Sequence, residues 1–558
     1  MGNWQEKVAQ KKRTTFEKIP KAWVQDQILT DFRDRPYSQV STYLDEVLPE
    51  SENEITKLTA CQIATKVARR ELTSSDVCYA FCHRAALAHQ ILNCCVEIFF
   101  ESALERAKEL DRILEQTGEV VGPLHGVPIS LKDQVNLPGI ETTIGYVSYI
   151  GEKSQKKSLL AKALEEKGAI FYVKTAVPTA MLASETVSNV HGITLNAVNI
   201  EFSSGGSSGG EGALIGARGS PLGVGTDIGG SIRIPAAFQG LYGLRPSNGR
   251  IPYMDVTNSY AGQEIIQSVI GPLSASLEDL QLFTKTVVDS HTWDEDPKVV
   301  PIPWRDQSSL RQRKLRIGLM LWDKLVMPHP PVIRALKETC QSLLKEGHEI
   351  VEWDFPLQKE LLETADQVYG ADFYQEVEET LKLSGEPILE YMNLARKSCL
   401  NGRADPQPLS IAESWELVKK KNFFREQFFK KWNASAALTQ EGEPIDAIIC
   451  PVWPSAAFGA NEVKFGVENY TVPFNMLDCA SVVLPVTYVD KAIDLPDATY
   501  QPANELDAMQ FGYYSAEKFD KMPICIQVVC RRLEEEKVLT VASIIQDACR
   551  SFEEHTNN

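Results

Sequence analysis

The sequence has few of the features that mark a membrane protein or a secreted protein. Its 558 residues contain no apolar run close to the ~20 residues that a membrane-spanning helix needs. The N-terminal stretch is charged and lacks the apolar segment of a secretory signal. Twelve cysteines are too sparse for a disulfide scaffold, and no two of them form a CxxC pair. We therefore expect a cytoplasmic protein without a transmembrane segment.

Metal ligands and basic side chains are also scarce. The eight histidines are scattered and show no metal-binding spacing, so we expect no metal and no other cofactor. Acidic residues outnumber basic ones by 75 to 57, and the net charge of −18 would repel a phosphate backbone. Nucleic acid is therefore not an expected partner. Histidine is missing altogether between residues 192 and 290.

That histidine-free region contains a segment that is unusually rich in glycine and serine. Residues 205–231 read GGSSGGEGALIGARGSPLGVGTDIGGS and hold 11 of the 34 glycines. Glycine permits positive φ angles and close approach of the backbone to a ligand. Upstream, the segment VGPLHGVPISLKDQ at 121–134 contains one lysine, Lys132, after a short apolar run. A serine nucleophile in the glycine-rich segment would thus have a lysine as its candidate base.

The rest of the chain alternates short apolar strands with amphipathic helices. This alternation predicts an α/β protein with one large domain, whose mixed, largely parallel twisted sheet is covered by helices on both faces. We expect a helical N-terminal arm over 1–55, a main domain over 56–552 and a charged helical insertion over about 360–440. Apolar spacing also predicts a helix near Thr179–Glu185.

Two other interpretations of the glycine-rich segment are weaker. Gly205 to Gly209 satisfies GxSxG, the nucleophile pattern of α/β-hydrolases, but a glycine-rich tract matches it by chance. That fold also needs a strand before the serine and an aspartate and a histidine after it, and the sequence offers no convincing set. The phosphate-binding pattern GxxxxGK[ST] is absent. The remaining interpretation is a hydrolase that uses serine and lysine.

The glycine-rich segment, extended through IRIPAAFQGLYGLRPS to residue 247, resembles the signature region of the amidase signature family. The resemblance includes PLHGVPISLKD upstream and, more loosely, PICIQVV near the C-terminus, so it covers roughly residues 60–535. Within the family, GPLHGVPISLKDQ and GLRPSNGRIPY are similar to fungal acetamidases and, more distantly, to fatty acid amide hydrolases. The resemblance implies the amidase signature fold and hydrolysis of amides.

The resemblance also implies a catalytic triad. Ser231 corresponds to the nucleophile, Ser207 to a bridging serine on a cis peptide bond, and Lys132 to the base. Lysine can accept a proton only when it is neutral, and an apolar setting such as Val127–Leu131 would lower its pKa. His125 and His191, which flank the motifs, are the competing candidates for the base.

Further residues of the predicted site surround this triad. Backbone N–H groups in the glycine turn would bind the developing oxyanion, at about 3–4 kcal/mol per donor. Asp227 and Arg233 are expected to orient the catalytic groups. The predicted oxyanion donors are Ile228, Gly229, Gly230 and Ser231, and the predicted substrate contacts are Met181, Ser207 and Ser208.

The substrate that we expect is a small amide, as for an acetamidase, or a carbamate such as ethyl carbamate, cleaved through an acyl-enzyme. Three alternatives stay open: a fatty acid amide hydrolase that acts on long-chain amides, a glutamine amidotransferase subunit, and a binding protein without catalysis. A homodimer is compatible with the sequence.

Overall fold

The computed structural model describes residues 4–35, 39–393, 407–462 and 467–556, and among them eleven strands form one large sheet. In spatial order the strands are β1 (Cys95–Ile98), β3 (Ile170–Thr175), β2 (Pro128–Lys132), β6 (Leu222–Asp227), β8 (Val269–Ser274), β7 (Tyr242–Arg245), β12 (Ala480–Tyr488), β13 (Pro523–Cys530), β11 (Ala447–Pro451), β9 (Arg316–Leu319) and β10 (Glu349–Glu352). A second, two-stranded sheet pairs β4 (Val187–Ser188) with β5 (Gly192–Ile193).

The predicted mixed sheet is confirmed, but its parallel part is confined to two regions. Strands β3, β2 and β6 run parallel on one side, and β11, β9 and β10 run parallel on the other. The strands between these groups pair antiparallel. Parallel pairing follows helical crossovers, such as α8 (Leu159–Glu166) between β2 and β3. The apolar pattern did not reveal the antiparallel centre, because strands that are buried on both faces read as continuous apolar runs in either direction.

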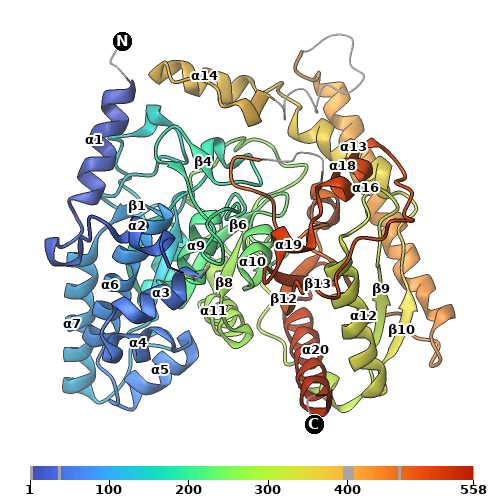
Figure 1. Cartoon of the computed structure of the whole chain (residues 1–558), viewed down its shortest axis with the longest axis horizontal. Helices are drawn as coiled ribbons and strands as arrows, with labels where there is room; N and C mark the ends of the chain where they lie inside the picture. The colour runs from blue at the N-terminus through green and yellow to red at the C-terminus, as the bar shows by residue number, and fades with distance from the viewer. Residues whose placement is uncertain (1–3, 36–38, 394–406, 463–466, 557–558) are drawn as a thin grey trace.

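The N-terminal segment forms helices that pack on the rest of the protein. It comprises α1 (Trp4–Phe16), α2 (Ile28–Arg33), α3 (Val40–Val47) and α4 (Glu50–Thr56), drawn in blue on the left of Figure 1. Apolar arm residues, among them Trp23 and Phe32, share one core cluster with α6 (Ser74–Leu92). The buried Lys11 pairs with Glu97 and Glu141 of the body. These contacts attach the arm to the edge of the sheet.

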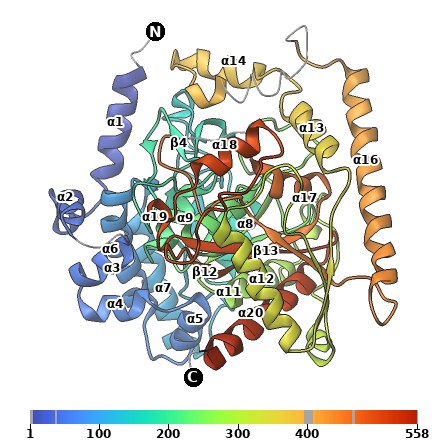
Figure 2. The ribbon, with the colours of Figure 1, turned by 45° about the vertical axis from the view of Figure 1, so that its right-hand side comes forward.

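The remaining helices flank the sheet. They are α5 (Ala60–Ala68), α7 (Phe100–Thr117), α9 (Gly209–Gly216), α10 (Arg233–Gln239), α11 (Leu277–Asp289), α12 (Pro330–Lys345), α13 (Gln358–Tyr369), α14 (Gln375–Ser384), α16 (Ile411–Ala434), α17 (Val472–Met476), α18 (Glu505–Tyr513), α19 (Ala516–Phe519) and α20 (Glu535–Thr556). Helices α5 and α7 lie on the same side of Figure 1 as the arm, and α12, α13, α16 and α18 lie on the opposite side. The described part of the predicted insertion is helical, and α16 stands along the outer edge (Figure 2). Residues 394–406 of the insertion lie outside the described residues.

The predicted helix near Thr179–Glu185 is wrong. Only a short 3-10 turn, η3 (Thr179–Met181), forms there. Ala180 and Met181 both have a φ of 61°, in the left-handed region, which interrupts helical geometry. The apolar residues whose spacing suggested a helix belong instead to a loop, and this loop places Met181 in the wall of the pocket described below.

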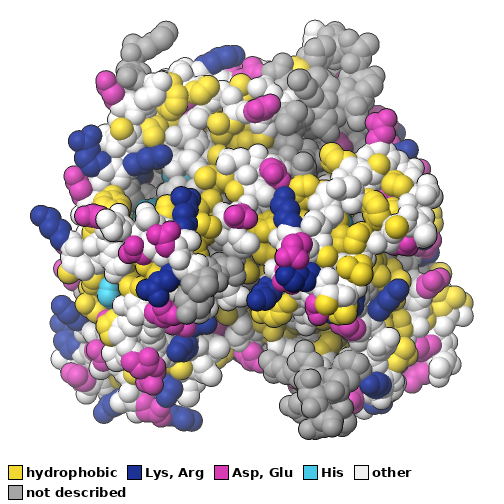
Figure 3. Space-filling view, viewed as in Figure 1, with side chains coloured by type: hydrophobic (Ala, Val, Ile, Leu, Met, Phe, Trp, Pro, Cys, Tyr) yellow, Lys and Arg dark blue, Asp and Glu magenta, His cyan; other side chains and the backbone are white. Residues whose placement is uncertain are grey.

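The surface mixes charges of both signs. On the face drawn in Figure 3, lysine and arginine side chains are interspersed with aspartate and glutamate. Within the described ranges, no helix combines the length and the apolar character that crossing a bilayer would require.

Candidate active site

The ends of two neighbouring parallel strands bring the site together. Lys132 is the last residue of β2, and Thr226 and Asp227 end the adjacent β6, with Leu131 in register with Val224. Carboxyl ends of parallel strands meet at one edge of a sheet, where open α/β folds bind their ligands. The loop that follows β6 contains Ser231 and leads into α10.

Lys132 is fully buried and held by two residues. Its amine lies 2.8 Å from the Ser207 hydroxyl and 2.7 Å from Oγ1 of Thr226. Burial lowers the pKa of Lys132 to about 7, although the carboxylates of Asp227 and Glu211 oppose this shift when they are ionised. A large fraction of the amine is therefore neutral near pH 7, which is the state that a general base requires.

The loops that contain Ser207 and Ser231 lie next to each other at this strand edge. The Gly206–Ser207 peptide bond is cis, in line with what the family resemblance implies for Ser207. The adjacent Ser208 N–H donates to the Ser231 carbonyl at 3.1 Å, which joins the two serine-containing loops. A side chain at Gly206 would place its Cβ 2.4 Å from the Ala183 carbonyl oxygen, so the loop can close only around glycine. The structure thus brings Lys132, Ser207 and Ser231 together.

The glycine turn that precedes Ser231 is fixed through its carbonyl groups. The Tyr369 hydroxyl donates to the Ile228 carbonyl at 2.7 Å, and the Thr471 hydroxyl donates to the Gly229 carbonyl at 2.7 Å. In a trans peptide the N–H points away from the carbonyl, so these bonds also set the directions of the Gly229 and Gly230 N–H groups. Ile228, Gly229 and Ser231 line the pocket.

Gly230 differs from the other predicted oxyanion donors. Its N–H donates to the Asp227 carboxylate at 2.8 Å, and Gly230 is not among the residues that line the pocket. Its φ of +130° is a conformation that residues with side chains rarely adopt, and a Cβ there would lie 2.6 Å from the Thr471 hydroxyl oxygen. Gly230 therefore shapes the turn, and its N–H is directed at Asp227 instead of the pocket.

Asp227 and Arg233 form a buried ion pair beneath the turn. Arg233 donates to both carboxylate oxygens of Asp227 at 3.0 Å, and Asn475 donates to the same carboxylate at 2.7 Å. Burial opposes ionisation of Asp227, but the charge of Arg233 and the hydrogen bonds outweigh it and hold the pKa well below its usual value. The Asp227 carboxylate accepts from the Gly230 and Ile232 N–H groups and thereby holds the turn. That the pair orients the catalytic groups stays a prediction.

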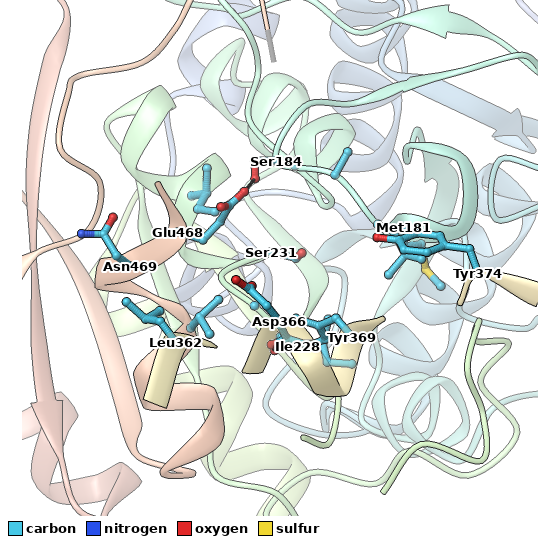
Figure 4. A pocket seen from close by; sticks show the side chains of 16 residues that line it. Met181, Ser184, Ile228, Ser231, Leu362, Asp366, Tyr369, Tyr374, Glu468 and Asn469 are labelled. Carbon is cyan, nitrogen blue, oxygen red and sulfur yellow. Dashed lines mark hydrogen bonds between the residues drawn. The ribbon is translucent and has the colours of Figure 1, made fainter. Parts of the chain in front are cut away.

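Ser231 opens onto a cavity of about 180 Å³. Figure 4 shows Ser231 at its centre, with Met181 and Tyr374 on one side and Asp366 and Tyr369 of α13 below. The cavity is lined by Met181, Leu182, Ala183, Ser184, Gly206, Ile228, Gly229, Ser231, Ile234, Leu362, Asp366, Tyr369, Tyr374, Glu468, Asn469 and Val472. Most of these groups are apolar, as in pockets for small uncharged ligands.

Two predicted substrate contacts are not among the residues that line the cavity. Ser208 is buried, its hydroxyl donates to the Thr226 carbonyl, and it accepts from the Thr226 N–H. Its position corrects the prediction, because a hydroxyl committed to the backbone does not face a substrate. Ser207 is also absent from the lining and faces Lys132. Of the three predicted contacts, only Met181 lines the cavity.

Several residues that hold the site together were not identified from the sequence. Thr226 lies in the glycine-rich segment 205–231, and Gln134 lies in the segment 121–134. Both are polar residues at or just after the end of a strand, and this position could have indicated that they belong to the site. Tyr369, Thr471 and Asn475 come from segments that are distant in the sequence, and no local pattern marks them. The competing bases also lie elsewhere: His125 accepts from the Val121 N–H, and His191 pairs with Ser188.

Comparison with known proteins identifies the family. The family model described as Amidase matches residues 76–539, so the chain belongs to the amidase family and is a hydrolase of amide C–N bonds. It is 40% identical to an acetamidase of Emericella nidulans over 547 residues, 97% of each chain. It is 39% identical to an acetamidase of Aspergillus oryzae, over 97% of this chain and 98% of that protein. A solved structure of fatty acid amide hydrolase superposes with a TM-score of 0.90 at 33% identity, covering 98% of this chain and 95% of that one.

Proposed function

We propose that the chain cleaves small amides with Ser231 as nucleophile, Ser207 as proton relay and Lys132 as base. The observation that supports this proposal is the buried Lys132 amine, 2.8 Å from the Ser207 hydroxyl, beside a serine that opens onto the pocket. The lowered pKa of Lys132 makes this amine a competent proton acceptor near pH 7.

The reaction would take place in two halves. The Ser231 oxygen attacks the amide carbonyl while its proton passes to Ser207, and the Ser207 proton passes to Lys132. The N–H groups of Ile228, Gly229 and Ser231 bind the oxyanion. The proton then returns through Ser207 to the departing nitrogen, and the C–N bond breaks to leave an acyl-enzyme. Water repeats the sequence in the second half, releases the carboxylic acid and regenerates Ser231.

For the substrate, we propose short-chain amides such as acetamide, with carbamates such as ethyl carbamate as chemically close alternatives. The names of the acetamidase relatives and the small cavity favour short acyl groups. Long-chain amides are a second candidate, because a fatty acid amide hydrolase is a structural neighbour and the pocket lining is largely apolar.

A series of primary amides with acyl chains from two to eighteen carbons separates these two candidates. We expect kcat/KM to peak at short chains, and neither detergent nor vesicles to raise it. Each methylene buried in an apolar tunnel would add ~0.8 kcal/mol, or about fourfold in kcat/KM, so a long acyl channel would give a steep rise with length. Efficiency that climbs to sixteen or eighteen carbons would reject the short-chain proposal. Ethyl carbamate in the same series tests the carbamate activity.

A cytoplasmic location and a homodimer also stay predictions from the sequence. Cell fractionation and sedimentation of the purified protein would test them.

A further inference from the structure

A chain of hydrogen bonds extends from Lys132 away from the pocket. Thr226 Oγ1, 2.7 Å from the Lys132 amine, donates to Oε1 of Gln134 at 2.5 Å. The Gln134 amide nitrogen donates to the Tyr253 hydroxyl at 2.9 Å and to the Thr257 carbonyl at 3.1 Å. The Tyr253 hydroxyl in turn donates to Ser268 at 3.0 Å.

One backbone group determines which groups donate and which accept in this series of hydrogen bonds. The Thr257 carbonyl can only accept, so the atom of Gln134 that faces it must be the NH₂ group. This assigns the amide orientation from its partners, and the Gln134 oxygen must then face Thr226. That oxygen can only accept, so the Thr226 hydroxyl donates its single proton to Gln134 and can only accept from Lys132.

This constraint orients the lysine amine. A neutral amine has two N–H bonds and one lone pair. Thr226 offers two acceptors on one side of the amine, Oγ1 at 2.7 Å and the backbone carbonyl at 3.5 Å. With both N–H bonds turned toward Thr226, the lone pair points at Ser207. We infer that Thr226, locked by Gln134, is a positioning residue that aims the Lys132 lone pair at the Ser207 proton. This inference depends on the proposed role of Lys132 as the base.

The same arrangement accommodates the protonated state. When Lys132 takes the proton of Ser207, its new N–H bond points at the Ser207 oxygen, and the bonds to Thr226 are unchanged. No side chain has to rotate between the two states, as expected of a preorganised site. The acidic groups that act electrostatically on the amine are Asp227 at the end of β6 and Glu211 of α9, and each favours the ammonium form when ionised. Burial raises the pKa of Glu211 to about 8.

The test compares Thr226→Val with Thr226→Ser in the full-length enzyme. Valine keeps the shape but removes the acceptor, so we expect kcat to fall ten- to a hundredfold with little change in KM. The ammonium form loses a hydrogen bond, so the acid limb of the pH profile should move to lower pH, a shift that loss of folded protein would not cause. Serine restores the acceptor and should return kcat to within about threefold of the parent, with the original pH limb.

Gln134→Met provides a second, independent measurement. If Gln134 acts through Thr226, the Thr226→Val/Gln134→Met double variant should be no slower than Thr226→Val alone. Additive losses, or a Thr226→Val enzyme with the parent's kcat and pH limb, would overturn the inference. If Thr226→Val fails to fold, Gln134→Met alone decides: a parental kcat and pH limb would reject the positioning role. A folded Lys132→Ala enzyme that keeps most of the parent's kcat and its pH limb would instead reject the proposed base, which keeps the two failures distinguishable.

Discussion

Replacing Ser231 with alanine is expected to abolish turnover while the protein stays folded. Loss of the nucleophile of a serine hydrolase lowers kcat by roughly six orders of magnitude. The change removes one oxygen from a side chain that lines an existing cavity, so we expect the melting temperature to stay within ~2 °C of the parent. Activity on a short amide, together with a thermal melt of the same preparation, measures both effects.

Covalent labelling makes the assignment specific. A fluorophosphonate that reacts with activated serines should modify Ser231 and no other serine, as mapped by peptide mass spectrometry. Ser208→Ala is the matched control, because the Ser208 hydroxyl bonds the Thr226 backbone and Ser208 is not among the residues that line the cavity. That variant should cost ~1 kcal/mol of stability yet keep the label on Ser231. A label on Ser207 or Ser208 would refute the nucleophile assignment and restore the GxSxG interpretation.

The sequence predicted the class of fold, and it singled out Lys132, Ser207 and Ser231, because both rest on local patterns. Short apolar strands that alternate with helices identify an α/β protein, and the long glycine-serine segment and the lysine motif are specific to one family. Strand direction in the middle of the sheet was not predictable in this way, because it depends on which strands pair and not on the pattern within each strand.

The residues that surround the catalytic groups could not be predicted from the sequence either, because their roles depend on contacts between distant segments. Tyr369 and Thr471 hold the carbonyls of the glycine turn from segments more than a hundred residues away. The assignment of Gly230 as an oxyanion donor needed correction because the direction of an N–H depends on its neighbours, here the Asp227 carboxylate. Thr226 lies directly before Asp227, inside the glycine-rich segment that the sequence analysis singled out. Its position next to Lys132 becomes visible only in the structure, because the two residues are on different strands.

Lys132→Ala should reduce kcat by three or more orders of magnitude, because the site loses both its base and the group that positions Ser207. In the parent enzyme, kcat/KM should rise with pH as Lys132 loses its proton, with a limb centred near its pKa of about 7, and then level off. The sign follows from the chemistry: the base is active when neutral, and lysine is neutral above its pKa. The residual activity of Lys132→Ala should lack this limb.

Two sets of controls separate Lys132 from its competitors. Burial lowers the pKa of His191 to about 3, far below a limb near 7, and it also lowers the pKa of His125. His125→Gln and His191→Gln should therefore retain the limb and most of the activity. Burial, with Glu468 nearby, raises the pKa of the pocket residue Asp366 to about 7, so its titration must be tested directly. Asp366→Asn should keep the pH limb. Two results would contradict the assignment of Lys132 as the base: loss of the limb in Asp366→Asn, or a folded histidine variant that is as inactive as Lys132→Ala.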